Sequence, residues 1–280
     1  MVMKLTSGSQ HKLRQALWAP VYADVLEILN GIANGHTLMA LGDDYHGKLN
    51  ASTFTGRKWH ADGIEGTITP SEALSAWDTP VTYEGPRSIP VLTYNGSDEY
   101  AIHADDTLFF RDDAGGANSM SMGMWVNLAN LTAGGMGFLS KRSGDGEWEW
   151  TTASGKPRLL LKDNSAGVTP FRLADATLSA ANVWLYVAAT YTGAGGGSAA
   201  DGILLYENAV VVASTSTNNG SYVGMENTTE GVGIGTNDVG NGLFLEGKVA
   251  GGPLSPWFAQ GVATIEELER IYQIGRAALI

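Results

Sequence analysis

After residue 91 the chain consists of short runs of alternating apolar and polar residues, separated by clusters of Gly, Asn, Asp and Ser. Alternation of this kind predicts β-strands that bury one face, and the clusters predict tight turns between them. Nine such runs occupy residues 119–127, 137–141, 147–152, 158–162, 184–191, 202–207, 210–214, 231–235 and 243–249. Many short strands joined by turns favour an antiparallel sandwich, and so a mainly β fold.

The N-terminal third has a different pattern. Between residues 10 and 33 apolar residues recur at three- and four-residue steps, which predicts one stripe of a helix. They are Leu13, Ala16, Leu17, Val21, Val25, Leu29 and Ile32. Pro20 divides the stripe, because proline is tolerated in the first turn of a helix but not in its interior. We expect residues 1–34 to form a helical arm whose stripe is buried against another subunit or a scaffold.

Residues 35–91 show no sustained period, and we expect an extended connector with a few short strands that wraps another surface. A short helix is predicted at the other end of the chain. Thr264 followed three residues later by Glu267 forms a capping box, and an apolar face then continues to about Gly275. Residues 92–280 are therefore expected to form the sandwich, with this helix sealing one edge.

Charge and composition exclude several classes of function. The net charge is −12 and Lys and Arg do not cluster, so nucleic acids and anionic membranes are poor partners. No apolar run approaches the ~18 residues that a membrane span needs, and the first residues lack the apolar segment of a signal peptide. We expect a soluble protein made in a cytoplasm. The chain has no cysteine, which excludes disulfides and cysteine-bound metals.

Several segments resemble, in order, the strands of one known family. They are residues 94–102 (YNGSDEYAI), 119–128 (SMSMGMWVNL), 137–141 (GFLSK), 182–191 (NVWLYVAATY), 203–211 (ILLYENAVV), 247–249 and the helix at 265–272. The chain from about residue 92 to 280 thus resembles the concanavalin A-like lectin/glucanase superfamily, particularly its laminin-G-like branch. The resemblance implies a jelly-roll sandwich with Trp125 in its core. Ala209 departs from the family pattern, which has an Asn-Gly turn at this position.

Glycanases of this superfamily carry paired carboxylates in a Glu-x-Asp-x-x-Glu pattern, because a retaining mechanism needs an acid and a nucleophile about 5–5.5 Å apart. The chain lacks that pattern, and its nearest approach is Glu147 and Glu149, which a strand would place on one face. Carboxylates on an exposed strand face are usually just solvated. We therefore expect no catalytic residues and no enzymatic activity.

Trp148 and Trp150 alternate with these acids and share the opposite face of the same strand. Two indoles at this spacing form a flat platform of the kind that stacks on sugar rings, with Asp145 and Glu147 beside it as hydrogen-bond acceptors. The same pattern also fits core packing, because one face of every sandwich strand is buried. The ligand-binding hypothesis and the core hypothesis both remain open at this stage.

A metal site is a further alternative. Carboxylate oxygens are the ligands that Ca²⁺ takes, and six acidic residues lie close together in sequence: Asp98, Glu99, Asp105, Asp106, Asp112 and Asp113. Their spacing matches no defined calcium loop, and solvated turns explain them equally. The five histidines show no zinc-binding spacing. We expect no cofactor other than this Ca²⁺ alternative.

Three functions follow from these observations. The first is a non-enzymatic structural protein of an assembly, a bacteriophage capsid-decoration or tail component located in the virion. Its arm would bind other virion proteins or its own subunits and form a homo-oligomer. The second is a soluble carbohydrate-binding module that remains cytoplasmic or recognises cell-surface glycans. The third is a glycan hydrolase. The missing catalytic pattern and the long N-terminal segment favour the first, and its viral part is an analogy at the level of the fold.

Overall fold

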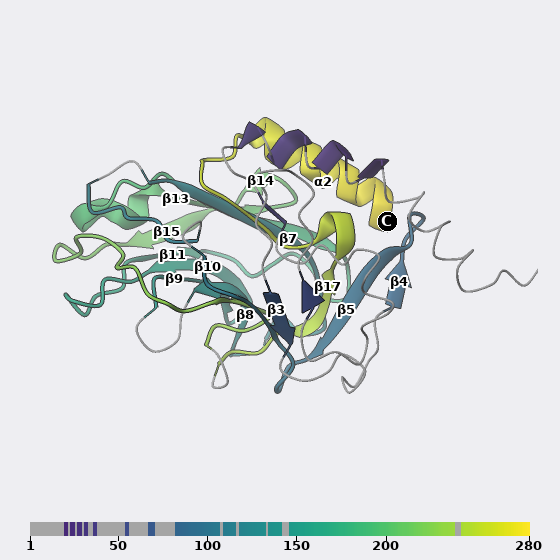
Figure 1. Cartoon of the computed structure of the whole chain (residues 1–280), viewed down its shortest axis with the longest axis horizontal. Coiled ribbons are helices and arrows are strands. Elements are labelled where there is room, and N and C mark those ends of the chain that lie inside the picture. Colours follow the sequence, from purple (N-terminus) through teal and green to yellow (C-terminus); the bar gives the residue numbers. More distant parts are fainter. Residues whose placement is uncertain are drawn as a thin grey trace, which may run out of the picture.

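The structure is a computed structural model. It describes residues 20–21, 23–25, 27–29, 31–32, 36–37, 54–55, 67–70, 82–106, 109–115, 118–132, 134–141, 146–238 and 242–280. The described residues form two antiparallel sheets that lie against each other, with helices over the outer face of one sheet (Figure 1). This is the mainly β sandwich that the alternating runs predict.

The first sheet contains strands from both ends of the described chain. Its order is β14 (Val210–Val211), β13 (Ile203–Glu207), β12 (Leu185–Tyr191), β7 (Met120–Leu128), β17 (Glu246–Ala250), β5 (Ile89–Asn95) and β4 (Thr82–Glu84). Two further strands join it beside β7, namely β18 (Trp257–Ala259) and, on β18, β1 (His36–Thr37).

The second sheet is also antiparallel. Its order is β15 (Ser214–Thr217), β11 (Phe171–Ala174), β10 (Lys156–Leu161), β9 (Trp148–Ala153), β8 (Gly135–Lys141), β16 (Val232–Ile234), β6 (Ala101–His103), β3 (Thr67–Pro70) and β2 (Phe54–Thr55). The described residues also form the 3₁₀ helices η2 (Gly196–Gly202) and η3 (Gly252–Leu254) and the α-helix α2 (Ile265–Leu279).

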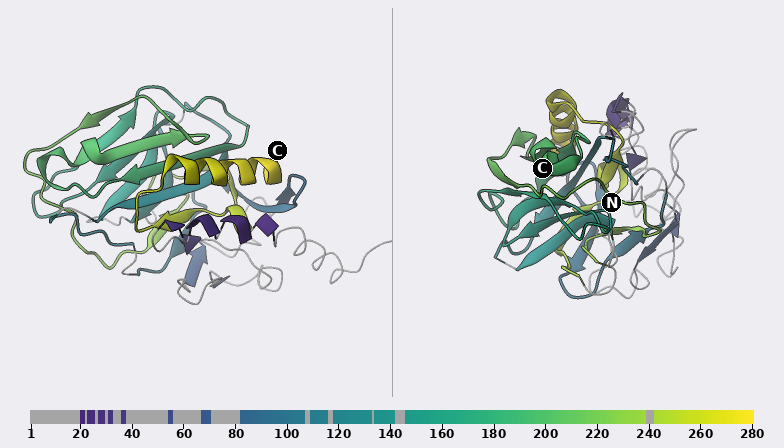
Figure 2. Two further views of the ribbon diagram at one scale, coloured as in Figure 1. Left: turned by 90° about the horizontal axis from the view of Figure 1, so that it is seen from above. Right: turned by 90° about the vertical axis from the view of Figure 1, so that its left-hand side faces the viewer.

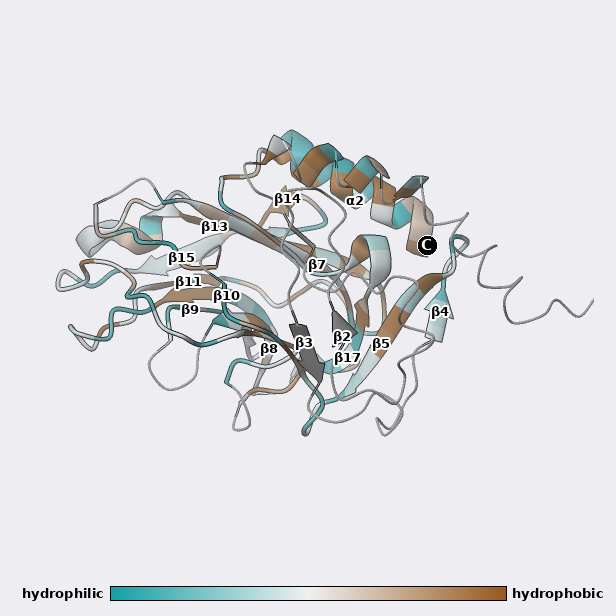
Figure 3. Ribbon diagram, in the orientation of Figure 1, coloured by the Kyte–Doolittle hydropathy of each residue, from teal (hydrophilic) through white to brown (hydrophobic). Residues whose placement is uncertain are grey.

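The first sheet is buried on both faces, and alternation along its central strands explains how. In β7, Met122 and Met124 point into the core between the sheets, whereas Trp125 belongs to a second core outside. In β12, Val187 faces inward and Tyr186 outward. Side chains of a strand alternate between its two faces, so one strand can supply two cores. Figure 3 shows apolar residues along β5 and on one side of α2.

Two helical segments cover the outer core. The described residues of the segment 20–31 are helical, and this segment lies alongside α2 above the first sheet (Figure 2). The predicted stripe supplies Val21, Val25, Leu29 and Ile32, all of them buried in the outer core. This differs from the expectation that the stripe is covered by another subunit, because α2 and the sheet of the same chain already cover these four side chains. Leu13, Ala16 and Leu17 lie outside the described residues.

The predicted boundary between connector and sandwich also differs from the structure. Strand β5 starts at residue 89 and pairs with both β4 and β17, so the sandwich begins before residue 92. Short strands from residues 36–70 pair with β18 and β6. The connector therefore contributes edges to both sheets.

Other details confirm the expected strands. Trp125 is 1% exposed and stacks on Tyr272, with ring centroids 5.7 Å apart. Trp184, by contrast, was also expected in the core but is only partly buried, and its Nε1 donates to Glu84 at 3.0 Å. The β13–β14 hairpin turns through Asn208 and Ala209 with φ of 51° and 64°, so alanine takes the left-handed conformation that a two-residue hairpin demands. The capping box of α2 is present at Thr264.

Candidate functional site

Trp148 and Trp150 lie in the core between the sheets and do not form a binding platform. Both are 0% exposed. Trp148 stacks on Phe258 at 5.6 Å and donates its Nε1–H to the carbonyl of Phe109 at 3.1 Å, and Trp150 packs edge-on against Phe138 at 5.0 Å. No surface is left on which a sugar ring could stack. The ligand-binding hypothesis for these two residues is therefore wrong, and the core hypothesis is the one that the structure supports.

Glu147 sits in a buried ionic cluster at the end of the sandwich. Its Oε1 lies 2.5 Å from Nζ of Lys141, the last residue of β8, and accepts from the backbone N–H of Thr228 at 2.8 Å. Lys141 also lies 3.0 Å from Oδ1 of Asp105 and donates to the carbonyl of Thr228 at 2.9 Å. Glu147 and Lys141 are each 0% exposed. Asp145, which was predicted to lie beside Glu147 as a ligand, is outside the described residues.

The surroundings of Glu147 shift its acidity. Burial is the largest cause and raises the pKa of the Glu147 carboxyl, because the charged form loses its water. Hydrogen bonds from Lys141 and Thr228 act in the opposite direction but do not cancel this effect. The second oxygen, Oε2, is buried and makes no hydrogen bond. The site thus combines a buried amine, an acid of raised pKa and a second carboxylate within contact distance.

Glu149 forms its ion pair with a different cation, Arg158. Its Oε1 accepts from Nη2 of Arg158 at 2.7 Å and from the hydroxyl of Thr151 at 3.3 Å. Glu149 is buried, so the expectation of a solvated strand face is wrong for this residue. Since Glu147 and Glu149 serve separate ion pairs, they do not face a common substrate position as a glycosidase pair would.

Sequence reasoning missed how buried carboxylates organise the loops at one end of the sandwich. Asp113 accepts from the hydroxyls of Tyr191 and Tyr222 and from the backbone N–H of Met225. Asp163 accepts from the N–H of Val223 at 2.9 Å. Together the two carboxylates anchor the loop 222–225 from inside. The aspartates are isolated in sequence from these partners, so spacing carried no signal for this cluster.

Within this cluster the pKa values of the tyrosines and of Asp163 are shifted in opposite directions. Burial is the largest cause that raises the pKa of Tyr191 and of Tyr222, and the nearby charge of Asp113 adds to it. Burial alone would also raise the pKa of Asp163, but hydrogen bonds from Val223, Ala166 and Ser165 outweigh it and hold that pKa below its ordinary value. Both tyrosines therefore stay neutral donors, and Asp163 stays an anion.

The six acidic residues proposed for calcium do not assemble into a site. Asp113 is saturated by its three donors, Asp105 lies against Lys141, and Asp98 accepts from the side-chain amide of Asn95 at 2.8 Å. Within the described part of the chain, no group of three or more His, Asp or Glu residues is arranged to bind a metal ion.

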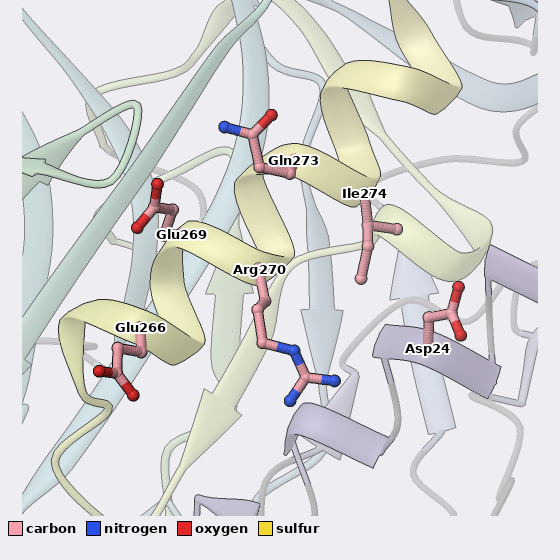
Figure 4. A pocket seen from close by; sticks show the side chains of 6 residues that line it. All are labelled: Asp24, Glu266, Glu269, Arg270, Gln273 and Ile274. Atoms are coloured by element: carbon pink, nitrogen blue, oxygen red, sulfur yellow. The ribbon is translucent and has the colours of Figure 1, made fainter.

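An open hollow lies between α2 and the helical segment 20–31 (Figure 4). Asp24, Glu266, Glu269, Arg270, Gln273 and Ile274 line it. Arg270 is 3.3 Å from Glu27, and both side chains are more than half exposed. Exposed ion pairs of this kind contribute little to the free energy of folding, and this hollow supplies no buried group for chemistry.

None of the helices in the described residues has the length and apolar character needed to cross a bilayer.

Two antiparallel sheets packed face to face, with an aromatic core between them, define a lectin-like jelly roll. A family profile described as the concanavalin A-like lectin/glucanases superfamily matches residues 95–252, which is more than half of the chain. The chain belongs to this superfamily, and the resemblance drawn from its strands is confirmed. No curated protein sequence matches the chain.

Solved structures with the same fold include binding domains of botulinum neurotoxins. The receptor-binding domain of botulinum neurotoxin D has a TM-score of 0.53 at 12% identity, and the match covers 81% of this chain and 54% of that one. A botulinum neurotoxin serotype D binding domain gives 0.52 at 11% identity, over 89% and 53%. A third structure gives 0.51 at 12% identity, over 80% and 52%, and concerns neurotoxin type C, whose cell entry depends on interaction with two ganglioside molecules. The chain spans about half the length of these structures, and the likeness shows the shared fold.

Proposed function

We propose that the chain is a non-enzymatic structural protein of an assembly, a bacteriophage virion component that displays the lectin-like sandwich as capsid decoration or as part of the tail. The non-enzymatic part is supported by the ion pairs that Glu147 and Glu149 form within the chain. Glu147 is bound by Lys141 and Glu149 by Arg158, with both carboxylates buried. A hydrolase needs an acid and a second carboxylate facing the same bond. In this sandwich both groups pair with cations of the same chain instead.

The assembly part of the proposal rests on how the N-terminal segment is used. The apolar stripe is packed on the sandwich, and Asp24 and Glu27 of the same helical segment are exposed. In our proposal, attachment to other virion proteins or to further copies of the chain uses the outward polar side of this segment and residues N-terminal to it. Its viral part remains an analogy from the fold.

Purified particles test this assignment. If the genes beside the coding sequence encode portal, capsid or tail proteins, the chain should co-purify with particles in a fixed ratio to the major capsid protein. Recovery of the chain in the soluble fraction, with none in the particles, would contradict a virion role. Incubation with a panel of glycans tests the non-enzymatic part. Reducing ends that appear with the unchanged chain and disappear with Glu147→Gln or Glu149→Gln would overturn it.

Glycan binding is a second candidate, and the internally anchored loop 222–225 favours it. Val223 is 60% exposed, and its backbone N–H is fixed by Asp163 at 2.9 Å. A loop held in one conformation loses little entropy on binding a ligand. The neurotoxin C structure, which shares the fold, concerns gangliosides. Binding to a glycan array that is lost in Val223→Asp and kept in Trp148→Phe would place a glycan on this loop. Loss in Trp148→Phe alone, with a native fold, would contradict it.

A further inference from the structure

Lys141 is a primary amine held inside the protein against two carboxylates. None of its side chain is exposed, and its Nζ lies 2.5 Å from Oε1 of Glu147 and 3.0 Å from Oδ1 of Asp105. Its remaining donor reaches the carbonyl of Thr228 at 2.9 Å. The desolvation of buried charges is costly, and their mutual attraction often fails to compensate for it. Condensation to a neutral amide would remove both the ammonium charge and one carboxylate charge.

We propose that Lys141 and Asp105 join in an intramolecular amide bond, and that Glu147 transfers the protons of this reaction. Nζ attacks Cγ of Asp105, an N–C bond forms, and one C–O bond of the carboxyl group breaks. The ammonium and the carboxylate together release one water molecule, so the reaction needs neither an oxidant nor a reductant. The fold holds the two groups in contact, which replaces a bimolecular encounter by an intramolecular one.

Glu147 is placed for proton transfer. Its Oε1 contacts Nζ, and its buried Oε2 has no hydrogen-bond partner. Burial, the largest effect, raises the pKa of this carboxyl, which makes it a better proton acceptor. Glu147 accepts one proton from the ammonium, which makes Nζ a nucleophile, and passes it to the departing oxygen of Asp105. After the N–C bond forms, Nζ loses a second proton, which Glu147 passes to the same oxygen, so that this oxygen leaves as water.

The position of the bond in the fold gives it a consequence for stability. Asp105 follows β6 and Lys141 ends β8, and both strands pair with β16. An amide between them fastens two strands across a third, in a chain that contains no cysteine. About a third of the Asp105 side chain is exposed, at 34%, which gives the released water a route out.

Mass spectrometry of the full chain tests the proposal. The purified, denatured protein should be lighter than its sequence by one water molecule. Trypsin should then yield a branched peptide in which residues 88–111 are joined to residues 112–142, because the modified Lys141 is no longer cleaved. Asp105→Ala and Glu147→Gln should each have the full sequence mass. Asp98→Ala, which removes a neighbouring carboxylate bound to Asn95, should keep the loss of water.

Several results would overturn the proposal. The unchanged chain at its full sequence mass would show that the contact is an ordinary ion pair. A branch from Lys141 to residues 143–158 would assign the bond to Glu147 instead. Persistence of the loss in Asp105→Ala would place the chemistry elsewhere, and full linkage in Glu147→Gln would remove its role in proton transfer. Asp105 lies at the surface, so its variant should fold and keep the experiment decisive.

Discussion

Asp113 and Tyr222 are joined by a hydrogen bond of 2.8 Å between residues 109 positions apart in the chain. Tyr191 donates to the same carboxylate at 2.5 Å, and the backbone N–H of Met225 at 2.7 Å. Asp113 is 0% exposed. These three donors take the place of the water that a carboxylate would otherwise bind. One buried charge therefore ties β12 to the loop that follows β15.

Replacing Asp113 by Ala should lower the free energy of unfolding by about 3 kcal/mol or more, because it leaves two buried hydroxyls and a buried N–H without their acceptor. The neighbouring Asp112 provides a matched control, since it is exposed and its carboxylate accepts from the N–H of Ala114 in a local turn. Asp112→Ala should change the free energy by no more than about 0.5 kcal/mol. Urea unfolding of both variants measures the difference. Equal losses would contradict the anchoring role of Asp113.

Alternation and turn chemistry predicted the sandwich because both are local signals. A strand such as β7 shows its two faces directly in the sequence. The same signals could not tell which outward face is covered by another element. The alternation places Glu149 on a face that we expected to be solvated. In the fold this side chain is buried and paired with Arg158 of the next strand. The stripe on residues 20–31 predicted a buried helix correctly but not its partner, because an apolar face does not specify which surface will cover it.

The candidate site was predictable only in part for the same reason. Glu147 was singled out by its spacing to Glu149, yet its partners Lys141 and Thr228 come from other elements. The Asp113 and Asp163 cluster depends on residues brought together by loops of irregular structure. Periodicity carries no information about such loops, so this cluster could not be predicted from the sequence.

Gly275 offers a test of the outer core with an unusual sign. An exposed helical glycine gains about 1 kcal/mol of stability when replaced by alanine. At Gly275, however, a Cβ would lie 2.2 Å from Nε1 of Trp125, which itself is stacked on Tyr272. Gly275→Ala should therefore lower the free energy of unfolding by about 1–3 kcal/mol through overpacking. Gly31→Ala is the control, because its Cβ would meet only Glu267, at 3.4 Å. Thermal melts should show a loss for the first variant and none for the second.

The β9–β10 hairpin turns at Ser154 and Gly155, with φ of 52° and 75°. Asn adopts this left-handed conformation more readily than Ser, and Asn-Gly is the preferred pair for such turns. The exposed Ser154→Asn variant should raise the free energy of unfolding by about 0.5 kcal/mol. Gly155→Ala should lower it by more than about 1 kcal/mol, because a Cβ would lie 2.1 Å from the carbonyl oxygen of Leu131. Destabilisation by Ser154→Asn would contradict this turn geometry.

His103 should make stability depend on pH. It is 2% exposed and packs edge-on against Phe109 at 5.0 Å. Burial is the largest effect and lowers its pKa from 6.5, while the carbonyl of Ala104 and the charge of Asp106 act in the opposite direction. The unfolded chain therefore takes up a proton near pH 6.5, whereas the folded chain takes it up only at lower pH. Because the unfolded state binds more protons in this interval, the free energy of unfolding must fall as the pH drops below about 6.5.

The His103→Gln variant isolates this effect. Other groups also titrate, notably Glu147, whose raised pKa makes stability fall as the pH rises above its ordinary value of 4.5. Such groups are common to both proteins and cancel in the difference between them. Urea unfolding between about pH 5 and pH 8 should show that the unchanged chain loses stability more steeply toward low pH than the variant does. Parallel curves would mean that His103 has the same pKa in the folded and unfolded states, and that its burial in the core has no effect on its protonation.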